Sequence, residues 1–404
     1  PMRLAFRKSH AVGTVQAPPS KSCAHRLLIA AALSHGRIEG LAPSQDILAT
    51  VDCLRALGFE CSYDGTCAQF GRRRDIVPGS RIVLPCRESG STMRFIIPLA
   101  LALAHADAAE FLIAGSDRLL ERGIAPYVRA LPSVSFSRTA HGILVSGRLE
   151  PGDFSLDAST SSQYLTGLMM ALPLCGKDSC IRLESEPVSR GYLDITADVL
   201  SQAGVRLQWQ NGRQLLIPGG QRYSLPATVR VEGDWTNAAY LEIYNYTSGS
   251  KVCITGLRDN SAQGDRVCRS LMTQLVTDGQ VDISENIDLG PVLFALAALK
   301  GGGRITGTRR LAIKESDRVK DMVTELEAFG VVARVQENEV EISATSLHAP
   351  SRTLDGHNDH RLVMALVPLL TVFTGSIDGA EAVSKSFPDY FEKLTELGIA
   401  YDRE

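Results

Sequence analysis

The stretch Ser20-Lys21-Ser22-Cys23-Ala24-His25-Arg26-Leu27-Leu28-Ile29-Ala30-Ala31-Ala32-Leu33 shows the design that decides the fold: a small polar cluster followed by a run that is apolar on nearly every side. Short polar side chains cap a helix by accepting hydrogen bonds from its free N–H groups. A helix that is apolar all round is buried rather than amphipathic. The stretch therefore predicts an internal helix with a polar N-terminus.

The same design recurs along the chain, at Ser89–Leu103, Ser161–Leu174, Asp234–Tyr246, Asp288–Leu299 and Asn358–Leu370. With Ser22, Ser91, Ser162, Thr236, Asp288 and Asp359 as anchors, the steps are 69, 71, 74, 52 and 71 residues. A second signature, a helix end followed by Gly and a strand-like entry, recurs out of phase at Gly58, Gly204, Gly330 and Gly398. Two signals with one approximate period predict an α/β chain of six similar units.

A doubly wound parallel α/β fold would also alternate strands and helices. However, the chain has neither G-x-G-x-x-G after a strand nor G-x-x-x-x-G-K-[ST], so the nucleotide-binding folds lack their phosphate loop. Strand-like stretches lie between the helices, for example at Arg81–Leu84, Gly142–Ser146, Thr228–Glu232 and Glu339–Ile342.

Length and charge narrow the classes of function. The 404 residues exceed one comfortable core, so two or three packed units are expected. The chain has 42 Lys and Arg against 45 Asp and Glu, a formal charge of −3, which argues against a nucleic-acid binder. The uncharged stretch Leu362–Ile377 is short for a membrane span and contains Pro368, so no membrane association is expected.

The spacing of the cysteines and histidines along the sequence does not match a metal-binding motif. Nine cysteines include no C-x-x-C pair, which indicates reduced thiols in a cytoplasmic protein, and the eight histidines include no H-E-x-x-H motif. We therefore expect no metal site.

Basic residues adjoin several of the polar helix starts. Cations at a helix N-terminus oppose the helix dipole unless an anion neutralises both, so their recurrence predicts a site for a ligand with several negative charges. The residues concerned are Lys21, Arg26, Arg87, Arg94, Arg309, Arg310, Lys314, Arg318, Arg361 and Lys385. A plainer interpretation exists for some: Lys314 and Arg318 have the spacing of a solvated helix face, and Asp234 is best explained as a simple cap. His360 is best explained as a packed or hydrogen-bonded histidine rather than a catalyst.

These residues resemble the enolpyruvylshikimate-phosphate synthase family over essentially the whole chain. The resemblance rests on the order and spacing of seven motifs, each weak alone: Ala17–Ser22 with Arg26, Glu88–Arg94, Ser161–Tyr164, Ser189–Tyr192, Arg310–Arg318, Asn358–Arg361 and Lys385–Asp389. Two positions depart from the family's pattern. Glu88 replaces an amide, and Arg310 stands where Asn is common, so Arg310 is left out of the predicted site.

The resemblance implies two similar globular halves, each of three βαβαββ units, with buried parallel helices whose N-termini face an interdomain cleft. One half would comprise residues 19–228 and the other residues 1–18 and 229–404, with the active site between them. It also implies transfer of the enolpyruvyl group of phosphoenolpyruvate to the 5-hydroxyl of 3-phosphoshikimate, with release of phosphate, by a monomer that needs no cofactor or metal.

The resemblance further assigns roles to residues of this chain. Asp288 is the candidate base, Glu315 the candidate proton donor, and Lys21 a group that touches both substrates. The expected 3-phosphoshikimate ligands are Lys21, Ser22, Arg26, Ser161, Ser162, Gln163, Ser189, Tyr192, Asp288 and Lys314. The expected phosphoenolpyruvate ligands are Lys21, Gly90, Arg122, Gln163, Arg318, Arg361 and Lys385.

Two rival functions remain at this point. The sister enolpyruvyl transferase that acts on a UDP-aminosugar shares the fold and the phosphoenolpyruvate chemistry, and commonly has a loop Cys as proton donor; Ser161–Gln163 and Lys314–Arg318 favour the shikimate enzyme. A non-catalytic anion-binding protein is the other rival, but it would gain nothing from the carboxylates Asp288 and Glu315.

Overall fold

The computed structural model describes residues 2–104, 109–187 and 189–404, which form two compact units. One unit contains residues 19–232, and the other combines residues 1–18 with residues 233–404. The predicted α/β class is confirmed, with three mixed sheets in the unit of residues 19–232. The chain returns to the other unit after residue 232, four residues later than the expected boundary at 228. The reason is that Thr228–Arg230 forms a strand that pairs with Arg37–Glu39.

The three sheets of the unit of residues 19–232 share one topology: two parallel strands, then an antiparallel hairpin. In sheet order they are β14 (Thr228–Arg230), β3 (Arg37–Glu39), β5 (Cys67–Arg73) and β4 (Phe59–Tyr63); β6 (Arg81–Arg87), β7 (Glu110–Gly115), β9 (Gly142–Ser146) and β8 (Ser135–Thr139); and β10 (Asp153–Leu156), β11 (Ser179–Leu183), β13 (Gln214–Ile217) and β12 (Gln208–Gln210).

The unit of residues 1–18 and 233–404 repeats this topology with two differences: in one sheet the antiparallel pair comes from residues 4–6 and 401–403 and is not a hairpin, and another sheet has only a parallel pair within the described residues. Its sheets are β16 (Gln280–Asp282), β17 (Gly302–Thr306), β19 (Glu339–Ser343) and β18 (Val332–Gln336); β20 (Leu354–Asp355), β21 (Gly375–Asp378), β1 (Leu4–Phe6) and β22 (Tyr401–Arg403); and the parallel pair β15 (Lys251–Thr255) and β2 (Val12–Gln16). The last sheet has two strands within the described residues, so this repeat lacks the hairpin of the expected βαβαββ unit.

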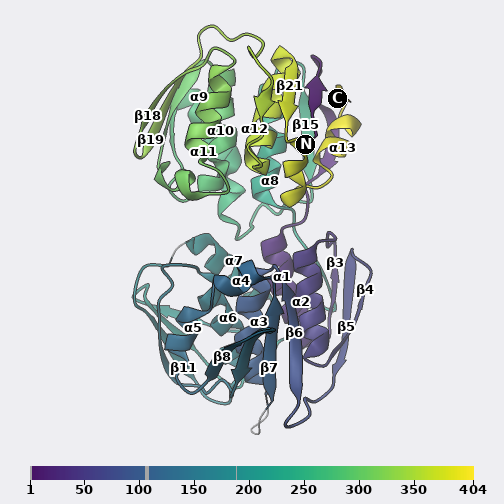
Figure 1. Cartoon of the computed structure of the whole chain (residues 1–404), viewed down its shortest axis with the longest axis vertical. Helices are drawn as coiled ribbons and strands as arrows, with labels where there is room; N and C mark the ends of the chain where they lie inside the picture. Colours follow the sequence, from purple (N-terminus) through teal and green to yellow (C-terminus); the bar gives the residue numbers. More distant parts are fainter. Residues whose placement is uncertain (1, 105–108, 188) are drawn as a thin grey trace. The chain divides into compact units, whose positions relative to one another are not determined.

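Helices lie beside the sheets of each unit: in Figure 1 strands β4 and β5 flank helix α2 (Gln45–Ala56), and β18 and β19 flank α10 (Gly290–Leu299) and α11 (Arg318–Glu327). The helices are α1 (Lys21–Ser34), α2 (Gln45–Ala56), α3 (Gly90–Leu103), α4 (Asp117–Glu121), α5 (Ala125–Ala130), α6 (Gln163–Ala171), α7 (Arg190–Gln202), α8 (Trp235–Glu242), α9 (Cys268–Asp278), α10 (Gly290–Leu299), α11 (Arg318–Glu327), α12 (His360–Phe373) and α13 (Tyr390–Glu396).

The six predicted apolar segments are α1, α3, α6, α8, α10 and α12, and all six are largely buried. Four begin at a side-chain cap: Ser20, Ser89, Asp234 and Asp359 accept a hydrogen bond from a backbone N–H of the first turn. The interpretation of Asp234 as a cap is therefore confirmed. The glycines of the second signature have φ angles of +97°, +71°, +89° and +97°, the left-handed region expected at a helix end.

No helix of residues 2–104, 109–187 and 189–404 has the length and apolar character of a membrane span.

Helices α3 and α6 approach closely at Gly167. A Cβ atom there would lie 2.3 Å from the hydroxyl of Tyr127 and 2.4 Å from the carbonyl oxygen of Arg94. Tyr127 is fully buried and donates its hydroxyl proton to that same carbonyl at 2.6 Å. The contact sets the spacing of the two helices, and with it the spacing of their polar N-termini.

We expect Gly167→Ala to lower the free energy of unfolding by about 1–3 kcal/mol, because overpacking would displace Tyr127 or the α3 backbone. Urea unfolding followed by circular dichroism measures the change. Gly176→Ala is the matched control, since a Cβ at Gly176 would meet no atom within 4 Å. Equal stability of the two variants would show that α3 and α6 separate without cost.

Candidate functional site

In the unit of residues 19–232, the N-termini of five helices surround one cavity of about 320 Å³. Its walls come from the starts of α1, α2, α3, α6 and α7. They contain all eight residues of this unit that were predicted to bind 3-phosphoshikimate: Lys21, Ser22, Arg26, Ser161, Ser162, Gln163, Ser189 and Tyr192. The structure thus brings together side chains that lie up to 171 positions apart, from position 21 to position 192.

Arg26 is a cation of this cavity that three contacts hold in place. Its Nε donates to the hydroxyl of Thr196 at 2.7 Å, its Nη1 donates to the carbonyl of Ser22 at 2.7 Å, and its guanidinium lies over the ring of Phe95. Burial lowers the pKa of Arg26 to about 10, so the side chain stays charged at neutral pH. A buried cation in a wall of hydroxyls and an amide suits an anionic polyol.

Beside the cavity lies a pair of guanidiniums, Arg94 and Arg122. A Cβ atom on Gly90 would lie 3.4 Å from Nη1 of Arg122 and 3.6 Å from Nη1 of Arg94, so both reach the start of α3. Within the described residues, neither has an ion pair with a carboxylate, and the buried Nε of Arg94 has no hydrogen-bond acceptor. Burial and the charge of Arg94 lower the pKa of Arg122.

Gln163 connects the guanidinium pair to the cavity. Its side-chain oxygen accepts a hydrogen bond from Arg94 at 2.5 Å, and its amide nitrogen donates to the hydroxyl of Ser91 at 2.9 Å. Two cations without a carboxylate, at the N-terminus of a helix, form a receptor for an anion. Gly90 keeps open the space that such an anion needs.

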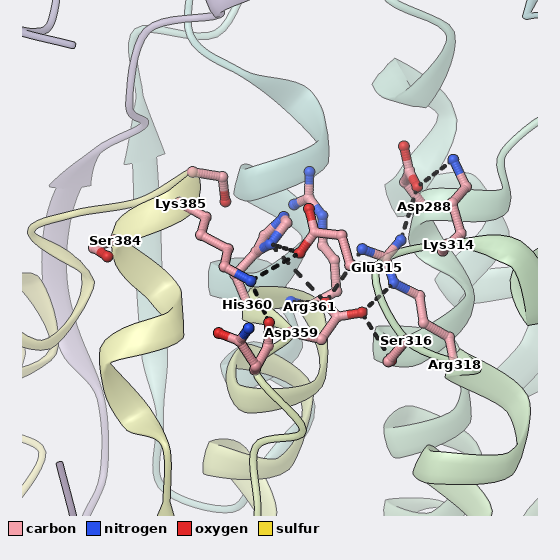
Figure 2. A network of polar contacts seen from close by, with 12 residues as sticks. Asp288, Lys314, Glu315, Ser316, Arg318, Asp359, His360, Arg361, Ser384 and Lys385 are labelled. Carbon is pink, nitrogen blue, oxygen red and sulfur yellow. Dashed lines mark hydrogen bonds and ion pairs between the residues drawn. The ribbon is translucent and has the colours of Figure 1, made fainter. Parts of the chain in front are cut away.

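The unit of residues 1–18 and 233–404 has a second polar cluster, drawn in Figure 2. All six residues predicted for this unit belong to it: Asp288, Lys314, Glu315, Arg318, Arg361 and Lys385. Asp288 lies in the turn that leads into α10, Arg318 begins α11, and Arg361 lies in the first turn of α12. Lys385 ends the 3₁₀ turn Ala380–Lys385.

Arg318 joins the parts of this cluster. Its Nε and Nη2 bind the two carboxylate oxygens of Asp359 at 2.8 and 3.2 Å, and its Nη1 binds Asp288 at 3.0 Å. Lys314 binds the same oxygen of Asp288 at 3.3 Å. The alternative interpretation of Lys314 and Arg318 as a solvated helix face is wrong for Arg318, whose side chain is 3% exposed.

The two carboxylates with predicted catalytic roles are both ionised. Burial alone would raise the pKa of Asp288, but Arg361, Lys314 and Arg318 outweigh it and lower the pKa to about 2. Burial likewise opposes ionisation of Glu315, while its hydrogen bond to His360 lowers its pKa below the ordinary value. The Nδ1–Oε2 distance between His360 and Glu315 is 3.0 Å, as expected for a hydrogen-bonded rather than a free histidine.

Glu315, Asp359 and His360 also offer three possible metal-ligand atoms within 4.8 Å of one another. Both oxygens of Asp359 already accept from Arg318, and Lys385 lies 3.7 Å from Glu315. A divalent cation would have to displace these cations and enter a region of positive charge. The donor set therefore fits an anion site better than a metal site.

Three residues at these sites are absent from the predicted substrate ligands. Arg94 was predicted among the cations of the anion site, and its i+4 spacing from Gly90 puts both on one face of α3. His25 and Asp46 line the cavity, although no motif marked them. Glu88, the departure from the family's pattern, is exposed.

Comparisons with known proteins show the family of this chain. A family model of EPSP synthase (3-phosphoshikimate 1-carboxyvinyltransferase) matches residues 7–394. Proteins named 3-phosphoshikimate 1-carboxyvinyltransferase from Clostridium kluyveri and Methanoculleus marisnigri are each 34% identical to this chain, covering 96% and 95% of it and 96% of their own lengths.

Solved structures show the same fold. EPSP synthase from Acinetobacter baumannii superposes with a TM-score of 0.85 at 19% identity and covers 100% of both chains. The enolpyruvyl transferase NikO from Streptomyces tendae has a TM-score of 0.69 at 14% identity, covering 100% of this chain and 98% of its own.

The ion pair between Arg318 and Asp359 yields a stability prediction. Asp359→Asn removes the charge that compensates a buried guanidinium, and we expect a loss of about 3–5 kcal/mol in the free energy of unfolding. Burial would raise the pKa of Asp359, but the hydrogen bonds and charge of Arg318 lower it below 3.8.

This stabilisation should therefore be present above about pH 4 and disappear as the pH falls below it. Urea unfolding between pH 3 and pH 7 measures both effects. Asp402→Asn, at an exposed pair with Arg7, is the control and should change stability little. A loss in Asp359→Asn that is the same at pH 3 and pH 7 would contradict the assignment.

Proposed function

The chain belongs to the EPSP synthase (3-phosphoshikimate 1-carboxyvinyltransferase) family, and we propose that its two polar clusters act together on the two substrates of that reaction. The reaction transfers the enolpyruvyl group of phosphoenolpyruvate to the 5-hydroxyl of 3-phosphoshikimate and releases phosphate. The observation that supports this most directly is the hydroxyl- and cation-lined cavity beside the guanidinium pair of Arg94 and Arg122.

We assign 3-phosphoshikimate to the cavity. The hydroxyls of Ser22, Ser161, Ser162 and Ser189, with the amide of Gln163, suit a polyol ring, and Lys21 and Arg26 suit its anionic groups. Phosphoenolpyruvate then takes the guanidinium pair beside Gln163 and the cations Arg318, Arg361 and Lys385 of the other cluster. Cationic side chains neutralise the charge that a metal would otherwise stabilise.

The chemistry is an addition followed by an elimination. The 5-hydroxyl adds to C2 of phosphoenolpyruvate and loses its proton to Asp288, while the methylene carbon gains a proton from Glu315. In the second step the methyl group returns a proton to Glu315, the bond from C2 to the phosphate oxygen breaks, and the departing phosphate takes the proton held by Asp288, which restores both carboxylates. Asp288 and Glu315 thus exchange protons with different substrate atoms.

Substrate binding would prepare both carboxylates. Asp288 has a pKa of about 2 because Arg361, Lys314 and Arg318 surround it, so in the free protein it is a weak base. Substrate phosphates and carboxylates that take over those cations would raise the pKa of Asp288 and strengthen it as a base. The same added negative charge would raise the pKa of Glu315 towards that of a proton donor.

We further propose that the chain works on small molecules as a monomer in the cytoplasm. All nine cysteines are free thiols, including Cys53 and Cys86, whose sulfur atoms lie 3.9 Å apart. Unpaired thiols at this distance suit a reducing compartment. The formal charge of −3 gives no support to nucleic-acid binding.

Release of phosphate from phosphoenolpyruvate plus 3-phosphoshikimate tests the function, with the UDP-aminosugar as the competing acceptor. We expect phosphate release when 3-phosphoshikimate is the acceptor and none when the UDP-aminosugar is the acceptor. Asp288→Asn should lower kcat about 10²–10⁴-fold, the usual contribution of an acid–base group. Near-normal kcat in Asp288→Asn would refute its role as the base, and preference for the UDP-aminosugar would refute the substrate assignment.

Arg122→Ala tests the anion site at the start of α3. We expect KM for phosphoenolpyruvate to rise by about ten- to a hundredfold, because a charge-assisted contact to an anion is lost. KM for 3-phosphoshikimate should change much less. Arg129→Ala is the control, because Arg129 lies on the neighbouring helix α5 and only pairs with Asp157 at 3.6 Å. Equal effects on both KM values would place phosphoenolpyruvate elsewhere.

A further inference from the structure

A buried carboxylate outside the predicted site, Glu325, is 1% exposed. It lies on α11, seven positions after Arg318, so two helical turns place both side chains on one face. A buried carboxylate requires donors for its oxygens, and Glu325 has three. One oxygen accepts from Nη1 of Arg352 at 2.8 Å and from the backbone N–H of Asp355 at 3.1 Å, and the other accepts from Nε2 of His357 at 2.8 Å.

Residues along one face of α11 bind the segment Arg352–Asp359, and the helix and the segment run in opposite directions. Arg318 binds Asp359, and Glu325 binds His357 and Arg352. Asp321, which lies between them on the helix, is 3.6 Å from Nδ1 of His357. Three positions along two helical turns therefore hold four positions of the segment, namely Arg352, Asp355, His357 and Asp359.

The backbone of this segment is strained where Glu325 holds it. His357 and Asn358 have φ angles of +50° and +52°, a left-handed conformation that non-glycine residues adopt at a cost in energy. Such a conformation persists only where surrounding contacts impose it. The bond between His357 and Glu325 and the bond between Arg318 and Asp359 flank these two residues and supply that constraint.

The strained segment Arg352–Asp359 directly contacts residues of the polar cluster around Arg318. The carbonyl of Asn358 accepts a hydrogen bond from Nζ of Lys385. Asp359 holds Arg318 and caps α12, whose first turn carries Arg361. A shift of the segment would therefore move three of the cations assigned to phosphoenolpyruvate.

We propose that Glu325 is a positioning residue for phosphoenolpyruvate binding, acting through His357 and the segment Arg352–Asp359. This inference rests on the proposed function, because it takes Arg318, Arg361 and Lys385 as the cations of that site. Glu325 does not touch the substrate; it fixes the backbone that orients those side chains.

Two variants test the proposal. In Glu325→Gln the amide nitrogen replaces an acceptor, so the side chain loses its bond from His357 or its bonds from Arg352 and Asp355 while keeping its shape. His357→Asn removes the imidazole but keeps a residue that tolerates a positive φ. Glu339→Gln is the matched control, because Glu339 also pairs with an arginine, Arg304, at 2.6 Å in the same unit.

We expect Glu325→Gln to raise KM for phosphoenolpyruvate about tenfold and to change KM for 3-phosphoshikimate less than about twofold. His357→Asn should have a similar effect, and the double variant should be no worse than the single ones, because both act through one contact. Unchanged KM values, or an equal rise in both, would overturn the proposal even if the melting temperature fell.

Hydrogen exchange at residues 355–361, compared between the intact variants and the wild-type chain, provides a readout that does not depend on turnover. Exchange there should be faster in Glu325→Gln than in the wild-type chain or Glu339→Gln, and addition of inorganic phosphate should slow it less in Glu325→Gln. An inactive wild-type chain would refute the proposed function alone. Identical exchange in Glu325→Gln and the wild-type chain would refute the positioning role.

Discussion

The buried charge of Arg318 is the interaction on which the polar cluster of the unit of residues 1–18 and 233–404 depends. Its side chain is 3% exposed and Asp359, its main partner, has no exposed side-chain surface. A guanidinium in such a place is stable only with carboxylates in good geometry. Because Asp288, Arg318 and Asp359 stand at the starts of α10, α11 and α12, the ion pairs also require these helix ends to meet.

The two polar clusters are balanced in different ways. Around Arg318 the cations are already compensated by Asp288 and Asp359, so an anionic ligand must compete with the protein's own carboxylates. At the start of α3 the guanidiniums of Arg94 and Arg122 have no carboxylate partner within the described residues. An anion that binds there does not have to displace a carboxylate of the protein. The unit of residues 19–232 thus presents the less compensated positive charge of the two.

Much of this organisation could be predicted from the sequence. The polar starts and apolar bodies of six helices could be recognised because capping and burial leave a local pattern. The cap glycines Gly58, Gly204, Gly330 and Gly398 were equally visible, since a left-handed residue is a local requirement. The family's motifs selected the residues that line the cavity and those that surround Arg318.

Contacts between distant positions left no such pattern. Glu325 looks like one more charge on a helix with a polar face, and only its burial against Arg352 and His357 distinguishes it. The missing hairpin beside β2 and β15 likewise depends on which strands find partners rather than on any local signal. Charge partners that lie 27 and 32 positions apart are decided by packing, which a single sequence does not display.

The two carboxylates that we propose as base and proton donor have different electrostatic surroundings. Asp288 is surrounded by three cations. Glu315 contacts one lysine, Lys385, and one histidine, His360, and its side chain is 41% exposed. Burial lowers the pKa of His360 below its ordinary value, although its bond to Glu315 opposes that shift. Added negative charge from a substrate favours protonation of His360 and Glu315 together. Asp288 would need to lose three cationic neighbours before it held a proton, so the more weakly compensated carboxylate is the one suited to deliver it.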